Sequence, residues 1–300
     1  MSNDCSRVGR RRYNWTALSI GQCVPRLNFG GRIHSLFERA CNVRLDDSAL
    51  ITFLAATLDD VPQGIRLDTA PSFVFDTLSL APGQRVFCRA GQVRFADSPL
   101  RIDLRTAQVW RSDLSALSID PSQPRVQRAV TIARQTLESY LLGWLDAPTS
   151  AQTGSAQPAM TALLDATRRL DRASACVAAE RLIGLGPGLT PSGDDFLVGY
   201  LAGLWSTARR DSPRYSFLVT LGAEIANRAG RTNAISRAYL RHAAQGCVSR
   251  AIATLASAIG AGEDSASVQQ AAYAALRVGH TSGAACVAGL LSGLCVSYTP

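Results

Sequence analysis

Hydrophobic and polar positions alternate in the first third of the chain and follow a longer period after Pro121 and Pro124. Leu100, Ile102 and Leu104 are separated by charged residues, which is the two-residue period of a strand with one buried face. Between residues 86 and 95, two stretches of this kind flank Ala90-Gly91 and predict a hairpin. The segment 48–111 is therefore interpreted as mainly β-structure.

Beyond the two prolines, apolar residues recur every three to four positions, which is typical of amphipathic helices. Helices are predicted over residues 126–144, 161–182, 196–209, 216–228, 235–245, 251–259, 268–278 and 286–296. The segment 147–158 is rich in Ser, Thr, Gln and Gly and predicts a flexible loop. We expect an α+β fold, in which an N-terminal, mainly antiparallel β domain (1–120) packs on a C-terminal helical bundle (121–300).

The composition excludes several classes of protein. The 300 residues are 47% hydrophobic and 18% charged, as in a globular chain with a buried core. No residue is lysine, which excludes a Walker A loop, a pyridoxal-phosphate Schiff base and a protein-kinase site. The formal charge of +8 comes from arginines spread along the chain, without a nucleic-acid-binding motif. We therefore expect anionic small molecules or acidic partner subunits, and no nucleic acid, as binding partners.

The cysteines, histidines and apolar runs give no sign of a zinc site or of export. The eight cysteines form no CxxC pair, and only three histidines accompany them. The basic run at residues 10–12 is not followed by a continuous apolar core, so no signal peptide is predicted. The late apolar run 284–298 is shorter than the roughly 20 residues that span a bilayer. These features predict a cytoplasmic protein without a membrane segment.

One Gly/Pro-rich loop leads into two adjacent carboxylates and then into an apolar helix. In the run GLGPGLTPSGDD, glycines allow a close approach of the backbone to a ligand, and Ser192 is a suitable helix N-cap. The residues expected to bind an anion here are Gly186, Gly188, Thr190, Ser192 and Gly193. Asp194 and Asp195 in the first helical turn are candidates for catalysis or for holding Mg²⁺, whereas the alternative is that they only cap the helix.

A second copy of this design lies near the C-terminus. Ser282-Gly283 matches Ser192-Gly193, and Gly289 and Gly293 match Gly199 and Gly203 in register. Glycines one turn apart allow two helix backbones to approach closely, so the two helices are predicted to pack with their Ser-Gly starts side by side. In the second copy, alanines 284 and 285 stand at the acid positions, which favours ligand chemistry over capping for the two aspartates. Ser282 and Gly283 complete the predicted anion site.

The other candidate site residues each have a structural alternative. His280 precedes the second Ser-Gly and is a candidate acid or base, or a loop histidine bonded to backbone. His34 is a candidate ligand contact in the β half, where a structural role competes. Thr232 and Ser236, four residues apart on one helix face, offer hydroxyl donors and Asn233 an amide donor, although capping explains Thr232 or Asn233 equally well. Arg231 and Arg237 are candidate clamps for an oxyanion.

These motifs together resemble the AllH-like family, once catalogued as a domain of unknown function. The resemblance spans roughly residues 30–298 and rests on GLGPGLTPSGDD, GHTSG at 279–283, RTNAIS at 231–236 and GRIHS at 31–35. The family includes a subunit of oxamate carbamoyltransferase from allantoin breakdown. An acid commonly follows the second Ser-Gly two positions on, where this chain has Ala285. The resemblance also implies partner subunits, one of them similar to an acyl-CoA synthetase.

The leading hypothesis is therefore a carbamoyltransferase subunit that acts on a small ureido or oxamate-type acid with carbamoyl phosphate or phosphate. Backbone amides would hold the phosphate or the developing oxyanion, and the aspartates would bind Mg²⁺ or a substrate amide. Two alternatives stay open: a non-catalytic anion-binding or scaffolding subunit, and a ligase or kinase that works without lysine. The sequence singles out no nucleophile or general base.

Overall fold

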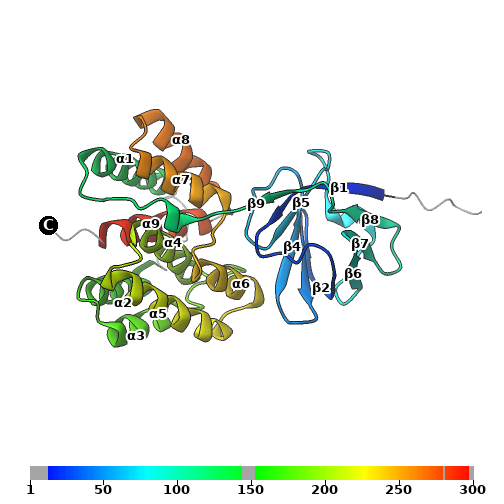
Figure 1. The fold of residues 1–300 in the computed structure, drawn as a ribbon, viewed down its shortest axis with the longest axis horizontal. Coiled ribbons are helices and arrows are strands. Elements are labelled where there is room, and N and C mark those ends of the chain that lie inside the picture. The colour runs from blue at the N-terminus through cyan, green and yellow to red at the C-terminus, as the bar shows by residue number, and fades with distance from the viewer. Residues whose placement is uncertain (1–12, 144–152, 280, 297–300) are drawn as a thin grey trace, which may run out of the picture. The chain divides into compact units, whose positions relative to one another are not determined.

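The computed structural model describes residues 13–143, 153–279 and 281–296 (Figure 1). The chain divides into two compact units, of which the first ends at Trp110 and the second begins at Arg111. The regular structure of the first unit is mainly strands and that of the second is helices, which confirms the predicted α+β class. Each unit has a hydrophobic core of its own.

The first unit is a mixed β-barrel. Its strands are β1 (Tyr13–Gly21), β2 (Phe29–Phe37), β3 (Ala40–Leu45), β4 (Leu50–Leu54), β5 (Gly64–Leu67), β6 (Arg85–Arg89), β7 (Gln92–Phe95), β8 (Leu100–Asp103) and β9 (Gln108–Trp110). Eight strands close in the order β5-β4-β3-β2-β6-β7-β8-β1 because β1 also pairs with β5, and β9 pairs with the end of β1. Most pairings are antiparallel; β1 with β8, β1 with β9 and β4 with β5 are parallel.

Buried and exposed residues alternate along the strands, and the buried set forms the core of the barrel. Val86 on β6, Val93 on β7 and Ile102 on β8 are fully buried. The residues next to each of them along its own strand face outward. The predicted hairpin is confirmed, since Ala90 and Gly91 have φ values of 49° and 76° between β6 and β7. These left-handed values match a two-residue turn of the kind that joins antiparallel strands.

The second unit is helical in its described residues. Its α-helices are α1 (Pro124–Leu142), α2 (Thr153–Arg168), α3 (Arg172–Leu182), α4 (Ser192–Thr207), α5 (Pro213–Arg228), α6 (Ala234–Ala243), α7 (Arg250–Ala261), α8 (Ser265–Leu276) and α9 (Ser282–Val296). Nearly all of α4 and α9 is buried, as expected for helices that are apolar on every side. Figure 1 shows these two central helices between α1, α7 and α8 on one side and α2, α3 and α5 on the other.

Two local predictions are wrong. The helix predicted over residues 161–182 is two helices, because Leu170 adopts a left-handed φ of 54° and Asp171 caps α3 by accepting a bond from the Ser174 amide. The loop predicted over 147–158 is helical from Thr153 onward, with Pro158 inside α2. Residues 147–152 of that loop lie outside the described residues.

The glycines of the repeated motif lie where α4 and α9 cross, as predicted. A Cβ atom added at Gly199 would fall on the carbonyl oxygen of Cys286, and one added at Gly289 would fall on that of Phe196. Gly203 and Gly293 face each other one turn further along, with 3.0 Å between an added Gly293 Cβ and the Gly203 Cα. The backbones of the two helices therefore touch directly, and the order of the contacts shows that the helices run parallel.

Across the described residues, none of the helices combines the length and the hydrophobicity needed to cross a bilayer.

Candidate functional site

The two Ser-Gly helix starts lie side by side. The hydroxyl oxygens of Thr190, just before α4, and Ser282, the first residue of α9, are 2.6 Å apart and share a hydrogen bond. Because α4 and α9 run parallel, their positive dipole ends meet at this point. The prediction of adjacent starts is confirmed, and the pair forms one polar site at the N-terminal ends of the two central helices.

The loop that leads into α4 depends on glycine backbone geometry. Gly184, Gly186 and Gly188 have φ values of 74°, 115° and 91°, a region that residues with a side chain rarely adopt. A Cβ added at Gly186 would also lie 2.8 Å from the Ser192 hydroxyl, whereas one added at Gly188 would meet open space. The loop therefore turns tightly over the helix start and presents exposed backbone at Gly188.

Some of the backbone amides predicted to bind an anion are already in use. The Gly193 amide donates to the Leu185 carbonyl oxygen at 2.9 Å, and the Gly283 amide donates to that of Val278 at 2.9 Å. These two glycines serve packing, because a Cβ at either would strike a carbonyl oxygen of the preceding helix. Their binding of an anion stays a prediction, although their amides already donate to protein carbonyl oxygens. The backbone amides of four other loop residues donate to no acceptor among the described residues: Gly186, Gly188, Thr190 and Ser192.

Asp194 anchors three segments to one another. Its side chain is buried, with 1% of the residue exposed. The Gly184 amide donates to its Oδ1 at 2.8 Å, and the Thr232 hydroxyl donates to its Oδ2 at 2.6 Å. Burial raises the pKa of Asp194, against the lowering effect of these bonds and of the Ser236 hydroxyl. Asp194 thus joins the loop, α4 and the start of α6, an anchoring role that the sequence did not reveal.

Asp195 differs from its neighbour because one carboxylate oxygen is free. Its Oδ2 is buried and has no hydrogen-bond partner among the described residues. Burial raises the pKa of Asp195 to about 7; the nearby charge of Asp194 also raises it, whereas hydrogen bonds from the Ser282 and Thr190 hydroxyls lower it. A half-buried carboxyl group whose pKa is raised toward neutrality, with one buried oxygen unused and two hydroxyls beside it, is suited to exchange a proton with a bound ligand.

The segment before α6 closes one side of the site. Asn233 caps α6 by accepting bonds from the amides of Ile235 and Ser236, and its Nδ2 donates to the Leu189 carbonyl oxygen at 2.8 Å. Ser236 is buried and its hydroxyl points to the same oxygen at 3.5 Å. Thr232, Asn233 and Ser236 therefore hold the loop and Asp194 in place, and the capping residue of α6 is Asn233. The predicted binding of a ligand by Thr232 and Ser236 stays a prediction.

The remaining predicted site residues are two histidines and two arginines. His34 lies on β2 of the first unit, with Nδ1 3.1 Å from the Ser35 hydroxyl; burial, and to a smaller extent the charge of Arg44, lower its pKa. His280 lies outside the described residues. Arg231 forms an ion pair with Glu180, so the clamp predicted there is already occupied. Arg237, the other predicted clamp, has a buried Nε without a partner in the described structure.

A magnesium ion shared by the two aspartates stays a prediction. Both oxygens of Asp194 accept bonds from protein donors, which leaves Asp195 Oδ2 as the unengaged carboxylate oxygen at the site. No group of three or more His, Cys, Asp or Glu side chains that would hold a metal comes together in the part of the chain described here. Any Mg²⁺ at this site would need most of its oxygen ligands from water or substrate.

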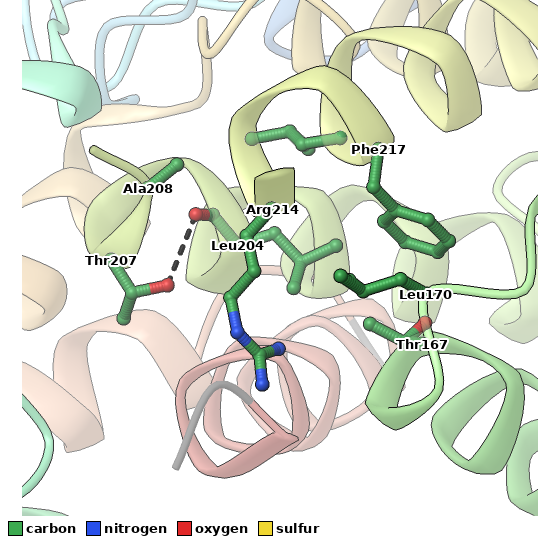
Figure 2. Close-up of a pocket in the computed structure, with 8 residues that line it drawn as sticks. Thr167, Leu170, Leu204, Thr207, Ala208, Arg214 and Phe217 are labelled. Carbon is green, nitrogen blue, oxygen red and sulfur yellow. Dashed lines mark hydrogen bonds between the residues drawn. The ribbon is translucent and has the colours of Figure 1, made fainter. Parts of the chain in front are cut away.

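A separate small pocket lies at the opposite end of α4. It is lined mainly by apolar side chains, with Thr167, Thr207 and Arg214 as its polar members (Figure 2). Thr207 donates its hydroxyl to the Leu204 carbonyl oxygen at 3.1 Å, and Arg214 extends toward the end of α9, where it donates to the Val296 carbonyl oxygen at 3.4 Å. These polar groups donate hydrogen bonds to backbone carbonyl oxygens. The residues that line the pocket include no side chain suited to act as a catalytic acid or base.

The fold and the site together define a two-unit α+β protein with a polar site at paired helix starts. Two family models match the chain: the oxamate carbamoyltransferase subunit AllH over residues 182–294, and the AllH family N-terminal domain over residues 16–109. The first match contains α4, α6, α9 and the loop between α3 and α4, and the second covers most of the barrel. The two matches together cover more than half of the chain, which belongs to the AllH family. No solved structure matches this chain.

Proposed function

We propose that this protein is a catalytic subunit of a carbamoyltransferase and transfers a carbamoyl group between phosphate and an oxamate-type acid at the joined starts of α4 and α9. The observation that carries the proposal is the buried and unpartnered Oδ2 of Asp195 beside the hydroxyls of Thr190 and Ser282. The family model for residues 182–294 is named for a subunit of oxamate carbamoyltransferase, and a subunit works in a complex. One partner is proposed to resemble an acyl-CoA synthetase.

The helix starts supply the anion-binding part of this site. The amides of Gly186, Gly188, Thr190 and Ser192 have no acceptor in the described protein, and the positive ends of two helix dipoles meet there. Phosphate, or the phosphate end of carbamoyl phosphate, would accept bonds from these amides. The chain contains no lysine, so a permanently charged cation on the anion would be an arginine, for which Arg237 is the candidate.

Asp195 would act as the general base and general acid that accepts and returns the proton of the reacting nitrogen. In one direction, the amide nitrogen of oxamate attacks the carbamoyl carbon of carbamoyl phosphate, Asp195 accepts a proton from that nitrogen, and the carbon–oxygen bond to phosphate breaks. The products are the carbamoylated oxamate and phosphate. In the reverse direction, a phosphate oxygen attacks the same carbon while protonated Asp195 returns the proton to the leaving nitrogen. The Thr190 and Ser282 hydroxyls orient the carboxyl group in both directions and would donate hydrogen bonds to the carboxylate of oxamate.

The two directions of transfer are expected to have opposite pH profiles. Because burial raises the pKa of Asp195 to about 7, the proton-accepting form grows as pH rises through 7 and the proton-donating form declines. Transfer from carbamoyl phosphate to oxamate should therefore rise across pH 6 to 8, while the phosphate-dependent reverse reaction should fall. Initial rates of the assembled complex, measured in both directions at saturating substrate, test this.

The matched control for the pH experiment is Asp195→Asn, whose residual activity should not change with pH in this range. Parallel profiles in the two directions of the wild-type complex would contradict the role of Asp195 as the proton carrier.

The second candidate is a non-catalytic anion-binding subunit. It is favoured by one observation, that Asp194 is committed to anchoring and leaves a single free carboxyl group at the site. In that case Asp195→Asn would change the affinity for substrate but leave the catalytic rate of the saturated complex, kcat, unaltered. Separating KM from kcat in the complex therefore distinguishes the two functions.

A further inference from the structure

The outward surface of β6, β7 and β8 carries a cluster of arginines around one exposed aromatic ring. Phe87 and Arg89 on β6, Arg94 on β7 and Arg101 on β8 all occupy exposed, outward positions. The strand register places Arg94 directly opposite both Phe87 and Arg101. Phe87, Arg89, Arg94 and Arg101 are called the arginine face below.

The charges of the arginine face are not neutralised by the described protein. Nearby arginines have partners: Arg85 pairs with Asp46 at 3.1 Å, and Arg105 pairs with Asp103 at 2.6 Å. Arg89, Arg94 and Arg101, in contrast, have no ion pair or side-chain hydrogen bond with any residue the structure describes. Like charges placed directly opposite on neighbouring strands destabilise a sheet, so folding alone does not explain Arg94 beside Arg101.

One exposed apolar side chain lies within this charged surface, and a second lies at the turn between two of its strands. Phe87 is 36% exposed and pairs across the sheet with Gly30, which has no side chain of its own to pack against the ring. Leu27 is 63% exposed and lies at the β6–β7 turn, where the Gly91 amide donates to its carbonyl oxygen at 3.1 Å. Exposed aromatic and aliphatic groups among arginines are typical of the centre of a protein–protein interface.

We propose that the arginine face binds an acidic surface of a partner protein, with Phe87 and Leu27 in contact with apolar groups of that partner. The positive charge of these arginines complements carboxylates, and bidentate contacts with Asp or Glu match the guanidinium geometry. Single-stranded nucleic acid would instead call for successive aromatic platforms, and β6, β7 and β8 present one outward aromatic residue among the described positions.

A photo-crosslinking experiment identifies the partner surface. Because the chain contains no lysine, amine-reactive reagents are unsuitable, so benzoylphenylalanine is placed at position 87 of the full-length protein in its native cells. The crosslinked peptides are expected to come from one protein and to be rich in Asp and Glu. Crosslinks to residues 111–300 of this chain, or to nucleic acid, would overturn the proposal.

Once crosslinking has identified the partner protein, charge reversal tests its binding, with both proteins purified. R94E and R101E each place opposite charges across the strand pair, so each variant should be at least as stable as the wild type. Each should weaken binding by about tenfold or more at low salt, and the loss should shrink as salt rises. Replacing the contacted partner acid by arginine should restore the binding of R94E.

The matched control is the double variant R128E/R210E, which changes two exposed arginines of the second unit. This double variant should bind the partner identified by crosslinking with the same affinity as the wild type. Wild-type affinity in both R94E and R101E, or an equal loss in the control, would overturn the assignment of the arginine face.

Discussion

Asp195→Asn is expected to lower carbamoyl transfer at pH 7 by about a thousandfold, within the range for loss of a general acid–base group, while leaving the free energy of unfolding nearly unchanged. The amide cannot accept or return the proton, but its oxygen can still accept bonds from Thr190 and Ser282. At the equivalent place in α9, Ala285 shows that the helix start forms without an acid. Rates of the assembled complex and urea unfolding of the purified subunit measure the two quantities.

The contrasting variant is Asp194→Ala. It removes the acceptor for the Gly184 amide and the Thr232 hydroxyl, so it should lower the free energy of unfolding by about 3 kcal/mol, the combined value of two charged hydrogen bonds. If Asp195→Asn instead destabilised the fold as much as Asp194→Ala and retained transfer, Asp195 would be a structural residue and the proposed chemistry would be rejected.

Gly199→Ala is expected to destabilise the helical unit by about 3 kcal/mol or more, at the upper end of the range for overpacking. The added methyl group would fall on the carbonyl oxygen of Cys286 in α9, and backbone atoms cannot turn aside as a side chain can. The two helices would have to separate, which would also pull Thr190 away from Ser282. Chemical unfolding followed by circular dichroism measures the stability, and Gly289→Ala should behave in the same way.

Gly230→Ala is the matched control for this effect, because an added Cβ there has no heavy atom within 4 Å. Its free energy of unfolding should stay within about 0.5 kcal/mol of wild type, as for ordinary surface substitutions. A Gly199→Ala protein as stable as this control would mean that α4 and α9 do not cross as closely as described.

The features predicted correctly from the sequence are those with a strict local period. Glycines at 199 and 203, matched in register at 289 and 293, are sufficient to predict a close crossing of two helices and hence adjacent helix starts. The β6–β7 hairpin followed from alternation on both sides of Ala90-Gly91. In each case a regular spacing within a segment predicts the contact, even where the contact itself joins two distant segments, as between α4 and α9.

The features that were missed depend on irregular or distant contacts. The strands before residue 48 were not predicted individually, because a bulge between Ile33 and Ser35 breaks the alternation of β2, and exposure does not alternate regularly along β3. Leu170 has a left-handed φ without being glycine, so nothing in its residue type marked the break between α2 and α3. The anchoring of Asp194 joins residues 38 positions apart, which no local period reveals.

The central claim is that an oxamate-type substrate binds at the joined starts of α4 and α9, and calorimetric titration of the assembled complex with oxamate in the presence of phosphate tests it most directly. Wild type should bind oxamate with a Kd in the millimolar range or tighter. Thr190→Val/Ser282→Ala should weaken binding by roughly 10- to 100-fold, the equivalent of one charged hydrogen bond or more, while R128E/R210E should not. Unchanged affinity in the Thr190→Val/Ser282→Ala complex, or no binding by the wild-type complex, would contradict the claim.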